Sequence, residues 1–201
     1  MTENYFAISI VPASISEYVP QFVTAEESAR RRRAALAAWA AVAAVLVALV
    51  GLIVLAPWAR AHGHEALGAA VHAGFGAACH QMPERAFHLW GLPMAVCARC
   101  FGLYVGAAAG ALCCPALRGL ARREAPGRAW LLAAAAPTSV DFALGLFGVW
   151  ENTHWSRFLT ALLLGAAAAF YLVTGAVDLA LARLGRSDTR LLKTLLEGVN
   201  R

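Results

Sequence analysis

The chain has 201 residues, of which 60% are hydrophobic and only 14% charged, and its formal net charge is +5. Together with a mean hydropathy of +0.61, this composition excludes an ordinary soluble globule and is typical of a bundle of membrane helices. We therefore expect the lipid bilayer to be its main partner. Membrane proteins accumulate basic residues on their cytoplasmic loops, so the positive charge predicts no nucleic-acid partner.

Four apolar stretches are long enough to cross a membrane. The first, about 34–58, is free of charged residues and follows a polar segment, 1–33, that ends in four arginines. The other three are expected at about 96–117, 130–149 and 158–182. About 20 apolar residues span the hydrocarbon core of a bilayer. The sequence thus predicts an all-α membrane protein with a four-helix transmembrane bundle over residues 34–183.

Shorter elements are expected between and after these helices. Residues 66–78 are apolar but too few to cross the membrane, so we expect a short interfacial helix there. Residues 79–95 are polar and contain the turn-forming residues Gly91 and Pro93. In the tail, 184–201, leucines recur at helical spacing beside basic residues, which predicts an amphipathic helix on the cytoplasmic surface.

The basic residues predict the orientation of the bundle. If both termini are cytoplasmic, 13 of the 17 lysines and arginines lie on that side. Only four lie on the other side: Arg60, Arg85, Arg99 and Arg157. Such a bias sets the orientation of proteins with short loops. We therefore expect a multi-pass protein of the cell (inner) membrane, with residues 59–95 and 150–157 facing outward.

Cysteines and histidines gather in the stretches expected on the outer side. Cys79 and His80 begin a polar run, and Cys97 and Cys100 form a C-x-x-C pair where the second helix begins. Two thiolates at this spacing can bind one ion, and Cys79 with His80 would complete the four ligands of a zinc-type site. Because neighbouring side chains tend to point apart, Cys79 is the stronger candidate of those two. The start of a helix also favours the thiolate form.

The second helix has two distinct faces. At 100° per residue, Cys97, Cys100 and Tyr104 share one face. Three glycines at four-residue spacing form the opposite face and predict close packing against another helix: Gly102, Gly106 and Gly110. Cys113 and Cys114, at the other end, are expected to be small buried residues.

Asp141 lies midway along the third predicted helix. A carboxylate at that depth costs about 2.5–3.5 kcal/mol on insertion scales, so we expect it to face the bundle interior beside an arginine. Arg99 and Arg157 are the favoured partners, with Arg85 third. Asp141, Arg99 and Arg157 are therefore candidates for a catalytic role, and the alternative is an ion pair that only fixes the register of the helices.

The motifs resemble those of the prokaryotic membrane protein family called domain of unknown function 2085. Its hallmark is C-H-Q-x-P-x-R-S-F, a short gap, and C-x-R-C-T-G-x-Y-x-G. The matching residues are Cys79, His80, Gln81, Pro83, Arg85, Phe87, Cys97, Arg99, Cys100, Gly102, Tyr104 and Gly106. Ala86 and Phe101 replace the usual serine and threonine. The resemblance covers about residues 66–165 and implies a membrane location and a shared Cys/His site, with no established reaction.

A later family element, D-G-x-x-Q followed by N-x-x-x-x-R-x-x-T-G, is kept only in part. Asp141, Asn152, Arg157 and Thr160 match it, whereas Phe142 and Ala161 replace glycines and no glutamine follows.

Three functions fit this sequence. The first is a metal site, most simply zinc, formed by Cys79, His80, Cys97 and Cys100. The second is a membrane thiol-disulfide oxidoreductase that uses Cys97 and Cys100. The third is a disulfide-stabilised scaffold or binding subunit with a membrane or extracytoplasmic partner of unknown identity. The chain has no H-E-x-x-H, P-loop, G-x-S-x-G or dinucleotide motif, which leaves open whether it is an enzyme.

Overall fold

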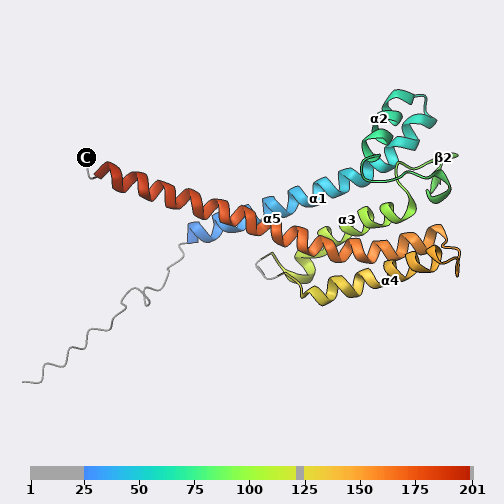
Figure 1. Cartoon of the computed structure of the whole chain (residues 1–201). Helices are drawn as coiled ribbons and strands as arrows, with labels where there is room; N and C mark the ends of the chain where they lie inside the picture. The colour runs from blue at the N-terminus through green and yellow to red at the C-terminus, as the bar shows by residue number, and fades with distance from the viewer. Residues whose placement is uncertain (1–24, 121–124, 200–201) are drawn as a thin grey trace, which may run out of the picture.

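The computed structural model describes residues 25–120 and 125–199 of the chain (Figure 1). The predicted segment 1–33 lies mostly outside these residues, as do 121–124 in the second connecting loop and the last two residues. The elements, in chain order, are α1 (Ala25–Ala61), α2 (Glu65–Phe75), η2 (Pro83–Arg85), β1 (His88–Leu89), β2 (Leu92–Pro93), α3 (Ala98–Arg118), α4 (Arg128–Leu146) and α5 (His154–Val199).

Four of these helices are long and apolar enough to cross a membrane: α1, α3, α4 and the part of α5 from His154 to Arg186. The expected all-α membrane fold is thus confirmed. α1 begins at Ala25 rather than near residue 34, because the arginine run is itself helical. There, Arg31 Nη2 lies 2.6 Å from Glu27 Oε1, one helical turn away.

The helices give the bundle two distinct ends. One end, here called the cysteine end, carries α2, η2, the β1–β2 hairpin, and the starts of α3 and α5 (Figure 1). The opposite end, here called the arginine end, carries Arg118 at the end of α3 and Arg128 at the start of α4. α1 and α4 run toward the cysteine end, and α3 and α5 run away from it.

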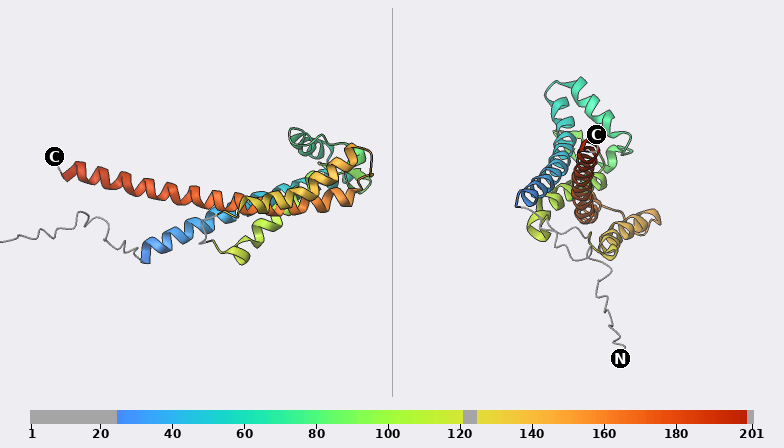
Figure 2. Two further views of the ribbon diagram at one scale, coloured as in Figure 1. Left: turned by 60° about the horizontal axis from the view of Figure 1, so that its bottom comes forward. Right: turned by 90° about the vertical axis from the view of Figure 1, so that its left-hand side faces the viewer.

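α5 is one continuous helix from His154 to Val199 and extends well beyond the other helices at the arginine end (Figures 1 and 2). We expected a helix that ends near residue 182 and a separate tail helix. No proline interrupts residues 154–199, and an internal glycine such as Gly185 costs a helix only about 1 kcal/mol. The tail therefore continues α5 through Val199.

The predicted glycine ridge of α3 is confirmed as a packing surface. α3 and α5 make the most extensive contact between helices. Side-chain carbons added at Gly102 and Gly106 would overlap the backbone carbonyls of Phe158 and Leu162 on α5. Gly165 of α5 faces Leu103 of α3 in the same way. The two backbones approach this closely only because these positions carry no side chain.

The remaining helices join this central pair from different sides. α1 is tied to α3 by the Trp39 indole, whose Nε1 donates to the Ala111 carbonyl at 2.8 Å. α4 packs on α5, and Asp141 is its one buried residue. The other residues of α4 are exposed or half-buried.

The polar run after α2 ends in a short hairpin. β1 pairs antiparallel with β2, and the two residues between them, Trp90 and Gly91, both have positive φ, 52° and 76°. This backbone suits a two-residue hairpin turn. The hairpin returns the chain to the start of α3, where the C-x-x-C pair lies.

Candidate metal site

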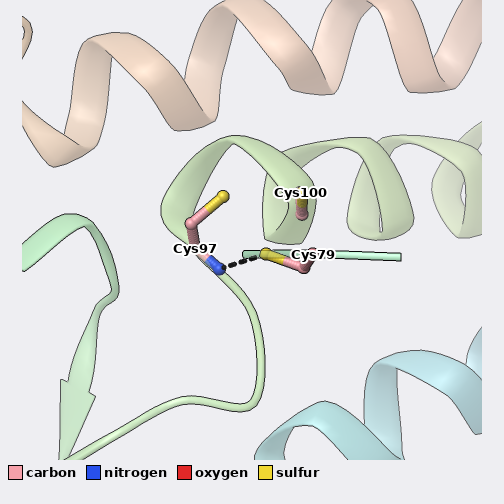
Figure 3. A group of neighbouring side chains, drawn as sticks. All are labelled: Cys79, Cys97 and Cys100. Carbon is pink, nitrogen blue, oxygen red and sulfur yellow. Dashed lines mark hydrogen bonds between the residues drawn. The ribbon is translucent and has the colours of Figure 1, made fainter. Parts of the chain in front are cut away.

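Three of the predicted ligands converge at the cysteine end. The Sγ atoms of Cys79, Cys97 and Cys100 all lie within 4.8 Å of one another. Cys79 is buried, whereas Cys97 and Cys100 are half-buried. Figure 3 shows Cys79 beside the first turn of α3, which carries Cys100 and follows directly after Cys97. All three are free thiols.

The backbone holds Cys79 in a setting that suits a thiolate. Its Sγ accepts hydrogen bonds from the backbone N–H of Gln81 at 3.4 Å and from that of Cys97 at 3.3 Å. Hydrogen bonds donated to a sulfur stabilise its negative charge. The side chain packs in an apolar cluster with Phe75, Met94 and Val96. Cys79 is thus fixed in position relative to the C-x-x-C pair.

Gln81 joins the two halves of the site, a role that we did not predict. Its Nε2 donates to the carbonyl of His72 in α2 at 2.5 Å and to that of Ala95 before α3 at 2.8 Å. Its backbone has a φ of 53°, in the left-handed region. The only signal in the sequence was the presence of this glutamine in the C-H-Q motif.

The electrostatics of the pair favour a thiolate at Cys97. A hydrogen bond from the Cys100 side chain lowers the pKa of the Cys97 thiol to about 5, and backbone N–H groups of the first turn of α3 add to this effect against partial burial. Cys97 is also the N-cap of α3, where the helix dipole favours negative charge. The surroundings of Cys97 therefore favour its thiolate form.

His80 does not join this group. Its side chain is exposed whereas that of Cys79 is buried, as expected for neighbouring residues that point apart. Within residues 25–120 and 125–199, the metal-ligand group at this end consists of the three cysteines alone. Three of the four predicted ligands are thus brought together in the structure.

The Asp141–Arg99 ion pair is present as predicted. Arg99 Nη2 lies 2.5 Å from Asp141 Oδ2, and the Asp141 side chain is only 8% exposed. The Arg99 guanidinium also lies 5.6 Å from the ring centre of Phe142. Phe142 is one of the positions where the chain departs from the family pattern, and here it adds a cation–π contact. Arg99 stands between Cys97 and Cys100, so this pair anchors the turn that carries both thiols.

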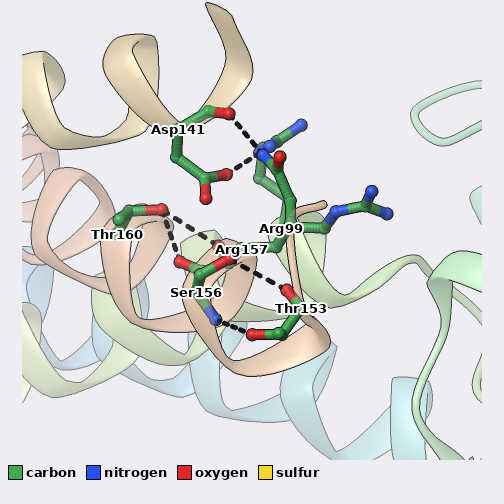
Figure 4. A network of polar contacts seen from close by, with 7 residues as sticks. Arg99, Asp141, Thr153, Ser156, Arg157 and Thr160 are labelled. Carbon is green, nitrogen blue, oxygen red and sulfur yellow. Dashed lines mark hydrogen bonds and ion pairs between the residues drawn. The ribbon is translucent and has the colours of Figure 1, made fainter. Parts of the chain in front are cut away.

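A polar network surrounds this ion pair at the start of α5 (Figure 4). Asn152 Nδ2 donates to the Asp141 carbonyl. Thr153 Oγ1 accepts from the Ser156 N–H at 3.1 Å, which caps α5. Arg157 follows in the first turn, half-buried, and its Nε has no hydrogen-bond partner among the described residues. Asn152 and Arg157, two further residues of the later family motif, thus lie near Asp141.

Aromatic side chains attach the loop of the site to the bundle. Phe87 lies 6.2 Å from Phe101 and 5.8 Å from Phe158, measured between ring centres. The His154 ring lies tilted against the same ring, at 5.6 Å between ring centres. Phe87 therefore fixes the loop between α2 and α3 against α3 and α5, and His154 serves in packing rather than as a ligand.

Four membrane-length helices with a three-cysteine cluster at one end define a multi-pass membrane protein with a cluster that could hold a metal ion. Residues 79–171 match the family described as "Predicted membrane protein (DUF2085)". This confirms the resemblance predicted from the two motifs, and the match includes all three cysteines and Asp141.

A similar protein is the "Uncharacterized protein MJ1492" of Methanocaldococcus jannaschii. It is 37% identical over 103 residues, which are 51% of this chain. The match spans 66% of that relative's length. No solved structure matches the chain.

Proposed function

We propose that this protein binds one zinc-like divalent cation through Cys79, Cys97 and Cys100 on the extracytoplasmic face of the cell membrane. The observation that carries the proposal is the convergence of three thiols from two segments, 18 residues apart, within 4.8 Å. Sulfurs bound to one tetrahedral zinc at 2.3 Å are about 3.8 Å apart. Binding therefore requires movements of about 1 Å at most.

The odd number of thiols favours a metal over a disulfide. A disulfide between any two of them would leave the third beside it with no partner. A metal uses all three, and the two N–H groups donated to Cys79 are suited to a metal-bound thiolate. Three protein ligands leave a fourth position for water or an external ligand, which is the arrangement of catalytic zinc sites.

The surrounding charges fit an anionic metal centre. Three thiolates and a divalent cation sum to one negative charge. Arg85, Arg99 and Arg157 lie near enough to influence one another electrostatically, and Asp141 neutralises only one of them. The remaining positive charge would offset the metal–thiolate centre.

Metal analysis tests this proposal. We expect the full-length protein, purified in detergent under reducing conditions, to contain about one zinc per chain. Serine at position 79, 97 or 100 should abolish retention. Cys113→Ser is the matched control, because Cys113, which we expected to be buried, is exposed and lies far along α3. A wild-type protein without bound transition metal and with a Cys97–Cys100 disulfide by mass spectrometry would contradict the proposal.

A second candidate function rests on the lowered pKa of Cys97 in a C-x-x-C pair at a helix start. The Cys97 thiolate would attack a substrate disulfide and release one substrate thiolate. The Cys100 thiolate would then displace the second, leaving a reduced substrate and a Cys97–Cys100 disulfide. A stoichiometric loss of these two thiols on mixing with a disulfide substrate would support this function. A protein with neither metal nor exchange activity would be a scaffold.

A further inference from the structure

A cleft at the arginine end, far from Cys79, Cys97 and Cys100, has a distinctive lining. Its volume is about 380 Å³, and it lies between the end of α3, the start of α4 and the middle of α5. Leu117, Trp130, Phe170 and Ala167 form apolar walls, and the Arg118 side chain also lines it. Leu117 and Trp130 are 70% and 73% exposed, so the walls continue into the surface that faces lipid.

Arg118 brings a guanidinium group to this cleft. Its side chain is half-buried, and its Nη1 is buried without a hydrogen-bond partner among the described residues. The ion pairs found in the described part of the chain involve other arginines. A buried donor left without a partner costs about 1–3 kcal/mol, and more when it is charged. A bound anionic group would offset the charge of the guanidinium that lines the cleft.

The position of the cleft determines what kind of anion can reach it. α3 ends at Arg118 and α4 begins at Arg128, so the cleft lies where the bundle leaves the hydrocarbon core. Trp130 and Tyr171 are side chains that favour this depth. The Tyr171 hydroxyl donates to the Gly127 carbonyl at 3.0 Å, which fixes one wall of the cleft.

We propose that this cleft binds a phospholipid. The phosphate accepts hydrogen bonds from the Arg118 guanidinium, and the first part of an acyl chain lies against Trp130 and Phe170. A guanidinium matches phosphate geometry with two parallel hydrogen bonds, and basic pockets between membrane helices are known to bind lipid headgroups. A soluble anion would use Arg118 but not the apolar walls. The volume suits the phosphate region and the start of a chain, with the rest of the lipid in the bilayer.

Native mass spectrometry of the full-length, delipidated protein titrated with phosphatidylglycerol tests the site. We expect one retained lipid on the wild type and at least tenfold weaker retention for Arg118→Gln. Arg128→Gln is the matched control, since it removes the same charge at the same end from an exposed side chain outside the cleft lining, and it should retain the lipid.

A second variant tests the cleft independently, in case Arg118→Gln does not fold. Ala167→Phe fills the cleft without changing any charge and should also lose the lipid. Equal losses in the Arg118 and Arg128 variants, or full retention in Ala167→Phe, would overturn the proposal. Displacement of the lipid by millimolar inorganic phosphate alone would overturn it as well, because it would indicate a simple anion site. Zinc content does not enter this test, so the proposal stands or fails independently of the metal site.

Discussion

At the scale of single residues, the neighbouring side chains of Gln81 and His80 differ in their contacts. The Gln81 amide bridges two backbone carbonyls, whereas the His80 ring is exposed. The adjacent Cys79 is the residue that joins the thiol cluster. The geometry of the site therefore depends on the glutamine more than on the histidine.

This contrast gives the first prediction. Gln81→Ala leaves two carbonyls without their donor, and we expect it to weaken metal retention and to lower stability by about 1–3 kcal/mol. His80→Ala should keep metal retention and stability at the wild-type level. Metal content and thermal unfolding of the two variants check the prediction, and a loss of zinc in His80→Ala would restore the histidine as a ligand.

The second prediction concerns the ion pair beside the thiols. Asp141→Asn removes the partner of Arg99, which lies between two ligands, and we expect about 10–100-fold weaker metal binding with near-normal expression, as for residues that support metal ligands. Asp178→Asn, an exposed carboxylate on α5, is the control. A loss of folded protein in Asp141→Asn would instead assign the pair to fixing the register of the helices.

At the scale of helices, the glycine contacts decide how α3 and α5 meet. We expect Gly106→Ala to destabilise the bundle, because the new methyl group would overlap the Leu162 carbonyl. Gly175→Ala on α5 meets open space and should leave stability unchanged or raise it by up to about 1 kcal/mol through helix propensity. Thermal unfolding in detergent checks both. Equal melting temperatures for the two variants would rule out the close approach.

The sequence predicted the four spans because a span requires only that one continuous apolar run be long enough to match the thickness of a bilayer. It also predicted the Asp141–Arg99 pair, because a carboxylate in hydrocarbon requires a partner. It did not predict the bridging role of Gln81 or the position of Phe87 among Phe101 and Phe158. Those depend on backbone turns and on contacts between distant segments, which the pattern of single residues does not contain.

At the scale of the whole molecule, the orientation in the membrane remains a prediction that rests on the 13-to-4 distribution of basic residues. We expect a cysteine placed at Glu151, at the cysteine end, to react with an impermeant thiol reagent in intact cells. A cysteine placed at Ser187, on α5, should react only after the cells are opened. The parent protein gives the background labelling from its own thiols. The reverse labelling pattern would mean that the orientation is opposite to the predicted one.

The continuity of α5 has a mechanical consequence. Its 46 residues make a rod of roughly 69 Å at 1.5 Å per residue, whereas the hydrocarbon core is only about 30 Å thick. A straight rod that crosses the bilayer cannot also lie flat on its surface. If the helix crosses the bilayer at right angles, more than half of its length, roughly 39 Å, extends beyond the hydrocarbon core. Its first turn carries Arg157 near the Asp141–Arg99 pair, so one unbroken helix connects the surroundings of the thiol cluster to the far end of the rod.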